Sequence, residues 1–485
     1  MALDTSTHTN FRYVALADEI QDSIMSGQYR PGEKLPSLRK LHTRLGLSVT
    51  TIHQAYIELE KRGRIEAKEK SGFYVKPLLK NPLPAPRKNP KTIRPSRVRI
   101  NAMAETILSD LQAPGLLRLG AAVASPELMP LKQLSRILKS MSMDELESGM
   151  ATYDVCSGSL DLRNALAKQM LGQACGVYAD DIVTTNGCLE AVSLCLRAVA
   201  DPGDTILVES PVFHCFLQLI EDLNMYVIEL PGCPETGIDP KAFEDLVKAN
   251  SIKACLLNTN FHNPLGSVLS MEAKKAILKI AQTHNLPIIE DDIYGDIYFD
   301  SKRPSTFKSI DTQGSVLYCS SFSKTLAPGL RAGWTIPGKY LERVVRLKLN
   351  TSLSSPNIGH RVVARFLETG AYDRHLRRLR NQIKNQMSAM SIAVANSFPK
   401  DTRVTFPRGG MVMWIELNKA IDTMEIYQKA RLHGISIMPG RICSSTDRYS
   451  HCLRLNCGLK WSTELEQGIA VLGQLIHEAS ELPLP

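Results

Sequence analysis

The chain has 485 residues, of which 44 % are hydrophobic and 22 % charged, and its formal net charge is +9. This length predicts two to four domains, and the composition is typical of a globular protein with a large core. The sequence has no run of about 18 apolar residues, so we expect no transmembrane helix. The polar residues 1–12 lack the apolar stretch of a signal peptide, and we predict a cytoplasmic location.

The 11 cysteines all lie at or after Cys156, and none of them forms a CxxC pair. An odd, scattered set indicates reduced thiols rather than a disulfide framework or a zinc site. His451, Cys452 and Cys457 form the one grouping that resembles a metal cluster. Buried cysteines of a core strand explain such a pattern more often, so we predict no metal site.

Residues 1–75 contain three helical patterns followed by a hairpin pattern. Apolar residues recur at helical spacing in residues 11–26, between Ser37 and Gly46, and from Ser48, a candidate N-cap, to residue 62. The stretch "RIEAKEKSGFYV" then alternates in polarity and contains a turn signal. Two short helices joined at "LGLS" and followed by a hairpin predict a winged helix-turn-helix. A three-helix bundle without a DNA role is the alternative.

Residues 76–100 hold eight Lys and Arg, no Asp or Glu, and six prolines. Proline excludes a helix interior or a central strand, so we predict an extended, semi-rigid linker. Two interpretations of its charge remain open. It is either a solvated spacer or a spacer that also contacts the phosphate backbone of nucleic acid.

From about residue 101 onward, short β-rich runs alternate with helical stretches such as residues 189–200 and 271–284. The runs are "DIVTTN", "TILVES", "ACLLNTN", "LPIIEDD" and "SVLYCSS". This alternation predicts a mostly parallel sheet with helices on both faces. Polar residues follow the runs directly, at the edge where open α/β sheets bind ligands.

The polar groups at these strand ends match the needs of one cofactor, pyridoxal 5'-phosphate (PLP). Lys324, in "SFSKTLAPGLRAGW", is a candidate to form a Schiff base with its aldehyde. The phosphate requires hydroxyls, a guanidinium and a helix N-terminus, and the pyridine nitrogen requires a carboxylate. The predicted phosphate contacts are Gly187, Cys188, Leu189, Ser321, Ser323 and Arg331. Phe213 offers a ring face, and Asn263 and Tyr294 offer contacts for the 3-hydroxyl. Each group alone has an ordinary structural explanation, so the prediction depends on their order.

The stretch "EKLPSLRKLHTRLGLSVTTIHQAYIELEKRGRIEAKEKSGFYV" resembles the DNA-binding domain of GntR-type bacterial transcription regulators. The resemblance implies double-stranded DNA as a partner and places Ser48, Thr50 and His53 toward the major groove. It also implies that Arg39 contacts phosphate and that Lys68 or Lys70 acts from the wing.

Residues 101–485 resemble the fold-type I aminotransferases, which implies an α/β domain with a mostly parallel central sheet and a smaller α+β subdomain. Lys324 matches the lysine that binds PLP covalently, and Asp291 matches the partner of the pyridine nitrogen. Arg454 matches the arginine that pairs with a substrate α-carboxylate. The remaining matches are Tyr294 and Asn263 at the 3-hydroxyl, Phe213 as the stacking ring, and Tyr153, whose role in the neighbouring subunit implies a homodimer.

The whole chain resembles the MocR subfamily, in which a GntR-type head is joined to an aminotransferase-like domain. The predicted domains are residues 1–75, a linker of residues 76–100, and residues 101–485. We favour a transcription regulator that senses PLP or its adduct with an amino compound. The alternatives are an active aminotransferase with a DNA-binding head and a mere dimerisation scaffold. The scaffold is disfavoured because Lys324, Asp291 and Arg331 are all kept.

Overall fold

A computed structural model describes residues 12–25, 28–29, 32–62, 64–68, 71–76, 83–87, 94–98, parts of 105–113, and 115–481. The chain divides into two compact units. The first, here called the N-terminal unit, comprises Met1–Pro82 and Ser388–Asn396. The second, the C-terminal unit, comprises Leu83–Met387 and Ser397–Pro485.

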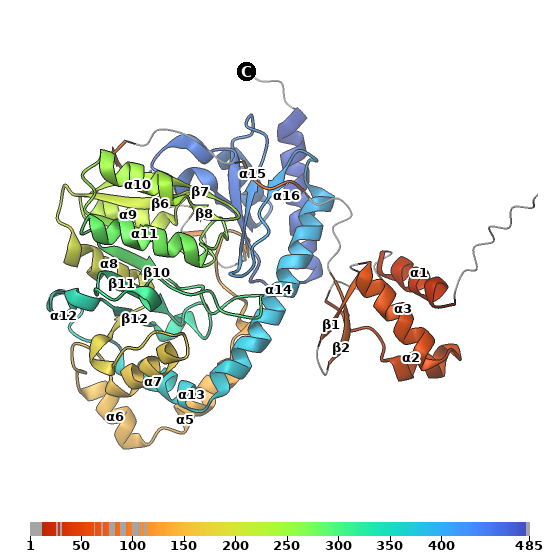
Figure 1. The fold of residues 1–485 in the computed structure, drawn as a ribbon, viewed down its shortest axis with the longest axis horizontal. Helices are drawn as coiled ribbons and strands as arrows, with labels where there is room; N and C mark the ends of the chain where they lie inside the picture. Colours follow the sequence, from red (N-terminus) through yellow and green to blue (C-terminus); the bar gives the residue numbers. More distant parts are fainter. Residues whose placement is uncertain are drawn as a thin grey trace, which may run out of the picture. The chain divides into compact units, whose positions relative to one another are not determined.

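The N-terminal unit contains three helices and a hairpin (Figure 1). They are α1 (Arg12–Met25), α2 (Leu38–Leu45), α3 (Val49–Lys61), β1 (Ile65–Lys68) and β2 (Gly72–Val75). Ser37 caps α2 by accepting a hydrogen bond from the amide of Lys40 at 3.3 Å, and Gly46 ends the helix with a φ of 67°. The predicted winged helix-turn-helix is confirmed.

The core of this unit is built on the inner face of α3. Tyr56 fixes that face, because its hydroxyl donates to the carbonyl of Pro36 at 2.8 Å and its ring meets the ring of Phe73 edge-on at 4.9 Å. Buried side chains of α1 and α2 complete the core. The buried residues of α3 are Ile52, Ala55, Tyr56 and Leu59, in agreement with the helical spacing of apolar residues in the sequence.

A nine-stranded sheet forms the centre of the C-terminal unit, in the order β3-β7-β6-β9-β10-β11-β12-β5, with β8 (Gly237–Ile238) paired to β7. The pairs from β7 through β11 are parallel, whereas β3, β12 and β5 join antiparallel. The strand bounds are β3 (Ser96–Arg97), β5 (Val183–Asn186), β6 (Thr205–Ser210), β7 (Tyr226–Cys233), β9 (Ala254–Leu257), β10 (Ile288–Asp291), β11 (Val316–Ser321) and β12 (Ala332–Ile336).

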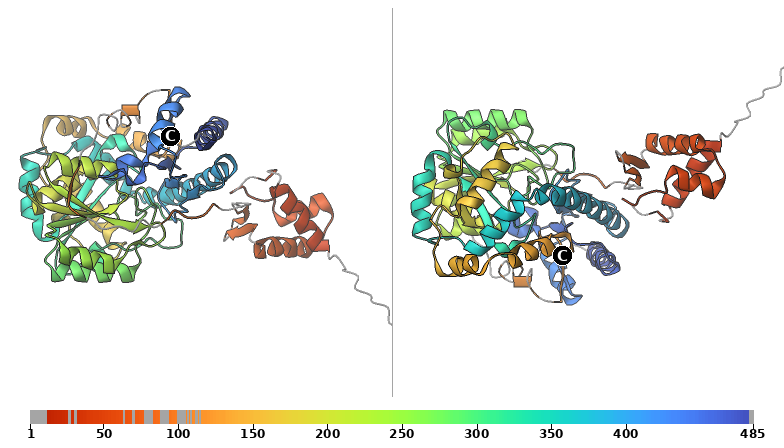
Figure 2. Two further views of the ribbon diagram at one scale, coloured as in Figure 1. Left: turned by 90° about the horizontal axis from the view of Figure 1, so that it is seen from above. Right: turned by 90° about the horizontal axis from the view of Figure 1, so that it is seen from below.

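Helices cover both faces of this sheet (Figure 2). Alternate residues of β6 enter different cores: Val208 packs with one set of helices and Leu207 with the other. The first set is α8 (Cys188–Val199), α9 (His214–Asp222) and α12 (Leu341–Leu349), and the second is α10 (Pro240–Ala249) and α11 (Met271–Thr283). The predicted mostly parallel sheet with helices on both faces is therefore confirmed.

A smaller antiparallel sheet follows in the order β13-β14-β17-β16. Its strands are β13 (Arg403–Val404), β14 (Val412–Glu416), β16 (Met438–Pro439) and β17 (Cys452–Asn456). The other paired strands are β4 (Leu117–Arg118) and β15 (Ile435–Ser436). The remaining α-helices with described bounds are α5 (Leu131–Lys139), α6 (Met143–Ala151), α7 (Leu160–Leu171), α13 (Asn357–Glu368), α14 (Ala371–Ser397), α15 (Thr423–Leu432) and α16 (Thr463–Glu481).

The described parts of the predicted linker are bonded to the C-terminal unit. The amide of Val404 donates to the carbonyl of Pro84 at 2.8 Å, and the amide of Arg87 donates to the carboxylate of Glu416 at 2.7 Å. Further along, β3 pairs with the edge strand β7. Residues 83–87 and 94–98 are thus anchored to this unit although several of their side chains are exposed, and β3 is an edge strand, as its proline-rich surroundings require.

None of the helices in the described residues is long and apolar enough to cross a membrane.

Leu59→Ala should unfold the winged-helix fold selectively. Leu59 is 0 % exposed, and truncation of such a side chain costs about 2–5 kcal/mol. Urea-dependent hydrogen exchange of α3 amides in the full chain measures the loss. Val49→Ala, at a position 42 % exposed on the same helix, should change the free energy of unfolding by no more than about 0.5 kcal/mol. Equal losses in the two variants would contradict this description of the core.

Candidate functional site

Lys324 lies in the turn that follows β11. Its Nζ donates a hydrogen bond to the carbonyl of Ala122 at 2.8 Å. Desolvation by the surrounding protein, and then the positive charge of Arg454, lower the pKa of Lys324 to about 8. An amine with such a pKa is partly neutral near pH 7, which is the condition for attack on a carbonyl group.

Asp291 ends β10 and is buried. Its Oδ1 accepts hydrogen bonds from the thiol of Cys188 at 3.3 Å and from the amide of Ile293 at 3.1 Å. Burial raises the pKa of Asp291 to about 6, so the carboxylate is mostly ionised at neutral pH but poorly solvated. Such a group stabilises a positive charge or an N–H placed beside it.

Arg454 on β17 is 1 % exposed. Its Nη1 donates to Oδ1 of Asn263 at 2.7 Å and its Nη2 donates to the carbonyl of Gly120 at 2.5 Å. Its Nε is buried and has no hydrogen-bond partner among the described residues. A buried donor without a partner costs free energy, and a carboxylate is the acceptor that a guanidinium binds best.

The turn between β5 and α8 forms an anion cradle with Arg331. Gly187, the N-cap of α8, has a φ of 92°, and a Cβ built there would lie 2.5 Å from Nη2 of Arg331. Arg331 itself has a φ of 52°, and its guanidinium donates to the carbonyl of Asn186. The amides of the first turn, at Cys188 and Leu189, belong to a 12-residue helix whose dipole favours an anion at this end.

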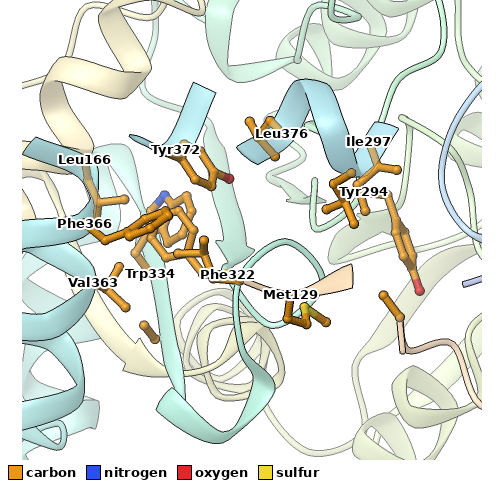
Figure 3. Packing of buried hydrophobic residues seen from close by; sticks show 14 of the residues in the cluster. Met129, Leu166, Tyr294, Ile297, Phe322, Trp334, Val363, Phe366, Tyr372 and Leu376 are labelled. Carbon is orange, nitrogen blue, oxygen red and sulfur yellow. The ribbon is translucent and has the colours of Figure 1, made fainter. Parts of the chain in front are cut away.

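The other predicted cofactor residues have different degrees of burial. Ser321 is buried and accepts a hydrogen bond from the amide of Ser323 at 3.4 Å. Phe213 is the N-cap of α9, partly buried against Phe216, with ring centroids 5.3 Å apart. Tyr294 is buried three residues after Asp291 (Figure 3), and burial raises the pKa of its phenol.

Tyr153 is not brought into this site within one chain. Its side chain is 81 % exposed, just beyond the end of α6. The side chain of Leu189 is also exposed. Its predicted contact with the phosphate would therefore be made by its backbone amide. The role of Tyr153 in a neighbouring subunit stays a prediction.

Several groups of the site escaped the sequence analysis. The carbonyls of Gly120 and Ala122, which hold Arg454 and Lys324, carry no side-chain signal. Asn258 follows β9, where it donates to the carbonyl of Asp291 and accepts from the amide of Asn263, both at 2.8 Å. Its position at a strand end was a usable signal, because polar residues there face the ligand edge.

His214 is a further buried group that the sequence analysis missed. Its Nδ1 has no hydrogen-bond partner in the described part of the chain. Burial, together with the charges of Arg454 and Lys324, lowers the pKa of His214 to about 3. The imidazole is therefore neutral at physiological pH.

The predicted DNA-reading side chains lie on the surface of the N-terminal unit. Arg39 on α2 and Thr50 and His53 on α3 are exposed. Ser48 is exposed as well, and its hydroxyl caps α3 by accepting from the amide of Thr51 at 3.1 Å. The side chain of Lys68 and all of Lys70 lie outside the described residues.

Comparison with known families assigns both units. Residues 128–472 match the model of aminotransferase class I and II, and residues 12–75 match that of the bacterial regulatory proteins of the gntR family. The chain belongs to both families. With a GntR helix-turn-helix and an aminotransferase domain in one chain, it is a transcription regulator of the MocR type, as the sequence analysis predicted.

The relatives of this chain include transcription regulators and aminotransferases. The chain is 35 % identical to the HTH-type transcriptional regulator YjiR of Escherichia coli, covering 97 % of this chain and 100 % of YjiR. It is 27 % identical to 2-aminoadipate transaminase of Thermus thermophilus, covering 78 % of this chain and 94 % of that enzyme. Among solved structures, LysN, the α-aminoadipate aminotransferase of Thermus thermophilus, matches with a TM-score of 0.73 and 25 % identity, over 80 % of this chain and 97 % of LysN. The fold-type I aminotransferase fold is confirmed.

The family depends on PLP, and the residues of this site fit that cofactor. Asp291 offers a carboxylate for the ring nitrogen, and Lys324 offers an amine of lowered pKa for the aldehyde. Gly187 and Arg331 offer a place for the phosphate. Of these groups, the turn at Gly187 depends most strictly on its residue type, because a β-carbon there would occupy the space of the guanidinium of Arg331.

Gly187→Ala should weaken PLP binding by at least about tenfold, because the new methyl group displaces the guanidinium of Arg331 and at least one charged hydrogen bond to phosphate is lost. Equilibrium titration with PLP, followed by absorbance, measures the change. Gly203→Ala is the matched control, since Gly203 has the same φ of 92° but nothing lies within 4 Å of a Cβ built there. Equal losses in the two variants would mean that backbone strain, not the cradle, is responsible.

Proposed function

We propose that the C-terminal unit binds PLP through Lys324, and that the bound cofactor, alone or with an amino compound, is the effector that tunes DNA binding by the N-terminal unit. The observation that carries this proposal is the pKa of Lys324, lowered to about 8 in a site that also holds a buried carboxylate. Desolvation that lowers the pKa of a lysine makes its amine nucleophilic at neutral pH.

Each residue has a distinct task in this proposal. Bound PLP would supply an aldehyde and an electron-withdrawing ring. Lys324 would be the covalent anchor, and Asp291 would keep a proton on the ring nitrogen. Gly187 and Arg331 would hold the phosphate, with the hydroxyls of Ser321 and Ser323 as further donors and the amides of Cys188 and Leu189 at the helix end. Phe213 would cover the ring, and Asn263 and Tyr294 would contact its 3-hydroxyl.

Arg454 would select the amino compound through its carboxylate. Its unpartnered Nε supports this role, because a carboxylate would restore the missing hydrogen bond. Arg454 also contributes to the lowered pKa of Lys324. A carboxylate that neutralises Arg454 would therefore raise the pKa of Lys324, so ligand binding changes the chemistry of the anchor.

A second copy of the chain is the proposed partner of an apolar surface that begins at α6. In the described residues, five large apolar side chains from α6 to the start of α7 are each more than half exposed. An apolar surface to which they all contributed would be one that monomeric proteins rarely leave uncovered. The five are Met143, Met150, Tyr153, Val155 and Leu160, and the presence of Tyr153 among them supports its predicted role across a homodimer.

The linker supplies a route from the site to the DNA-binding unit. Arg454 on β17 is paired in register with Trp414 on β14, and β14 ends at Glu416. Glu416 accepts the hydrogen bond from the amide of Arg87. A shift of β17 on ligand binding would thus reach the linker after crossing one neighbouring strand.

Lys324→Ala should abolish covalent capture of PLP. The wild-type protein should develop a visible absorbance. Borohydride should bleach this absorbance and leave the cofactor permanently attached to the peptide that contains Lys324. Because capture needs the neutral amine and the pKa is about 8, its rate at fixed PLP concentration should rise as the pH increases from about 6.5 to 9. Borohydride-stable labelling of the Lys324→Ala protein would overturn the assignment.

Operator affinity should differ by about 5–150-fold between apo protein and protein loaded with PLP or with PLP and a carboxylate-bearing amine. A ligand shifts DNA binding only if it prefers one of two arrangements of the protein. Fluorescence anisotropy with the upstream DNA at fixed salt measures the difference, and Lys324→Ala should remove it. Arg39→Ala should weaken binding in every ligand state without altering the ratio.

The competing interpretation is an aminotransferase with a DNA-binding head, and it is favoured by the identity to 2-aminoadipate transaminase. Equal operator affinity in all ligand states, together with transamination at about 1 per second or faster, would establish that interpretation instead.

A further inference from the structure

The N-terminal half of α14 is bonded to both loops that carry the predicted cofactor residues. Tyr372, the second residue of the helix, is buried, and its hydroxyl lies 2.9 Å from Oδ2 of Asp296 and 3.1 Å from Oγ1 of Thr325. Thr325 directly follows Lys324. Asp296 follows Tyr294 by two residues and Asp291 by five. A single phenol hydroxyl therefore joins the lysine loop to the loop after β10.

The direction of these hydrogen bonds follows from the groups involved. A carboxylate only accepts, so the phenol proton of Tyr372 goes to Asp296. Thr325 must then donate its own hydroxyl proton to the oxygen of Tyr372. The three side chains form a directed chain, Thr325 to Tyr372 to Asp296, in which each group fixes the rotamer of the next.

A second residue of α14 fixes the backbone next to Lys324. Nε2 of His375 lies 2.6 Å from the carbonyl of Thr325. Because a carbonyl only accepts, Nε2 carries the proton. Both the side chain and the carbonyl of Thr325, which is 2 % exposed, are thus held by α14. The spacing of three residues places Tyr372 and His375 on one face of the helix.

The loop on the Asp296 side is equally restrained. Nε of Arg380 donates to the carbonyl of Asp296 at 2.7 Å, and Nε of Arg303 donates to its carboxylate at 2.8 Å. The amide of Ile297 donates to the carbonyl of Tyr294 at 2.8 Å, which closes the turn between them. These bonds connect Tyr294 through Asp296 to α14.

The ring of Tyr372 is also locked in the core. It packs edge-on against Phe322, with centroids 5.6 Å apart, and Phe322 packs in turn against Trp334 (Figure 3). Phe322 precedes Lys324 by two residues. Tyr372 therefore contacts two side chains of the lysine loop, the apolar ring of Phe322 and the hydroxyl of Thr325.

We propose that Tyr372 is the positioning residue of the cofactor site, and that α14 registers whether this site is filled. This inference rests on the proposed function. When the site is filled through Lys324, the lysine loop loses freedom, Thr325 and Asp296 hold Tyr372 more persistently, and α14 opens less often. Tyr372 does not touch the ligand; it acts through Thr325 and Asp296.

Hydrogen exchange with and without PLP tests this proposal on the full chain. In the wild type, saturating PLP should slow exchange of α14 amides in residues 376–387 by about tenfold or more, the size of one hydrogen bond to a charged group. Tyr372→Phe should lose most of this protection while keeping a PLP-dependent visible absorbance. Tyr427→Phe is the matched control, because it removes another hydrogen-bonded buried tyrosine hydroxyl, the donor to Asp110, and should retain the full protection.

A pair of variants at Thr325 keeps the test decisive should Tyr372→Phe fail to fold. Thr325→Ser keeps the hydroxyl and should behave as wild type. Thr325→Val keeps the shape and should behave as Tyr372→Phe. Equal protection in Thr325→Ser and Thr325→Val, or wild-type α14 exchange that ignores PLP although the absorbance appears, would overturn the inference alone. If no absorbance appears in the wild type, the proposed function itself fails.

Discussion

The C-terminal unit depends on the removal of three ionisable groups from water at one edge of its sheet. Lys324, Asp291 and Arg454 are each shifted away from their ordinary pKa values, and desolvation is the largest cause for all three. Such groups are expensive to bury unless their environment compensates them. The fold compensates them partly with protein acceptors and donors, and the proposed ligand would supply the remainder.

The architecture makes that desolvation achievable. Parallel strands bring Asp291 and the Lys324 turn to the same edge, because the carboxyl ends of such strands lie side by side. Arg454 lies on β17 of the smaller sheet, and its guanidinium donates to Asn263, which follows β9 of the nine-stranded sheet. A relative shift of the two sheets would therefore alter the charge that Lys324 experiences, which is what the proposed effector site requires.

The sequence predicted the parts of this site that depend on local pattern. The winged helix, the strands and the residues at the strand ends were predictable because polarity alternation, capping residues and turn residues act over a few positions. Lys324 and Asp291 were found in this way. The carbonyls of Gly120 and Ala122 were not, since a main-chain acceptor has no identity in the sequence. The bond between Thr325 and Tyr372 joins residues 47 positions apart, and no periodicity predicts such a pairing. The linker was predicted only as an extended spacer. That Arg87 is anchored to Glu416 by its amide was not predictable, because every non-proline residue has this group.

Under the proposed function, the internal partners of Arg454 would affect the dose response of this protein. Nη1 and Nη2 already hold Asn263 and Gly120, so an incoming carboxylate competes with groups that never diffuse away. Such competition reduces the apparent affinity by the fraction of time for which the guanidinium is free. Under the proposed function, the response would thereby be moved toward abundant amino compounds, and traces of similar molecules would leave the protein unaltered. If the proposed effector binds at Arg454, substitution of Asn263, rather than of Arg454, would be the change that adjusts the concentration at which this regulator responds.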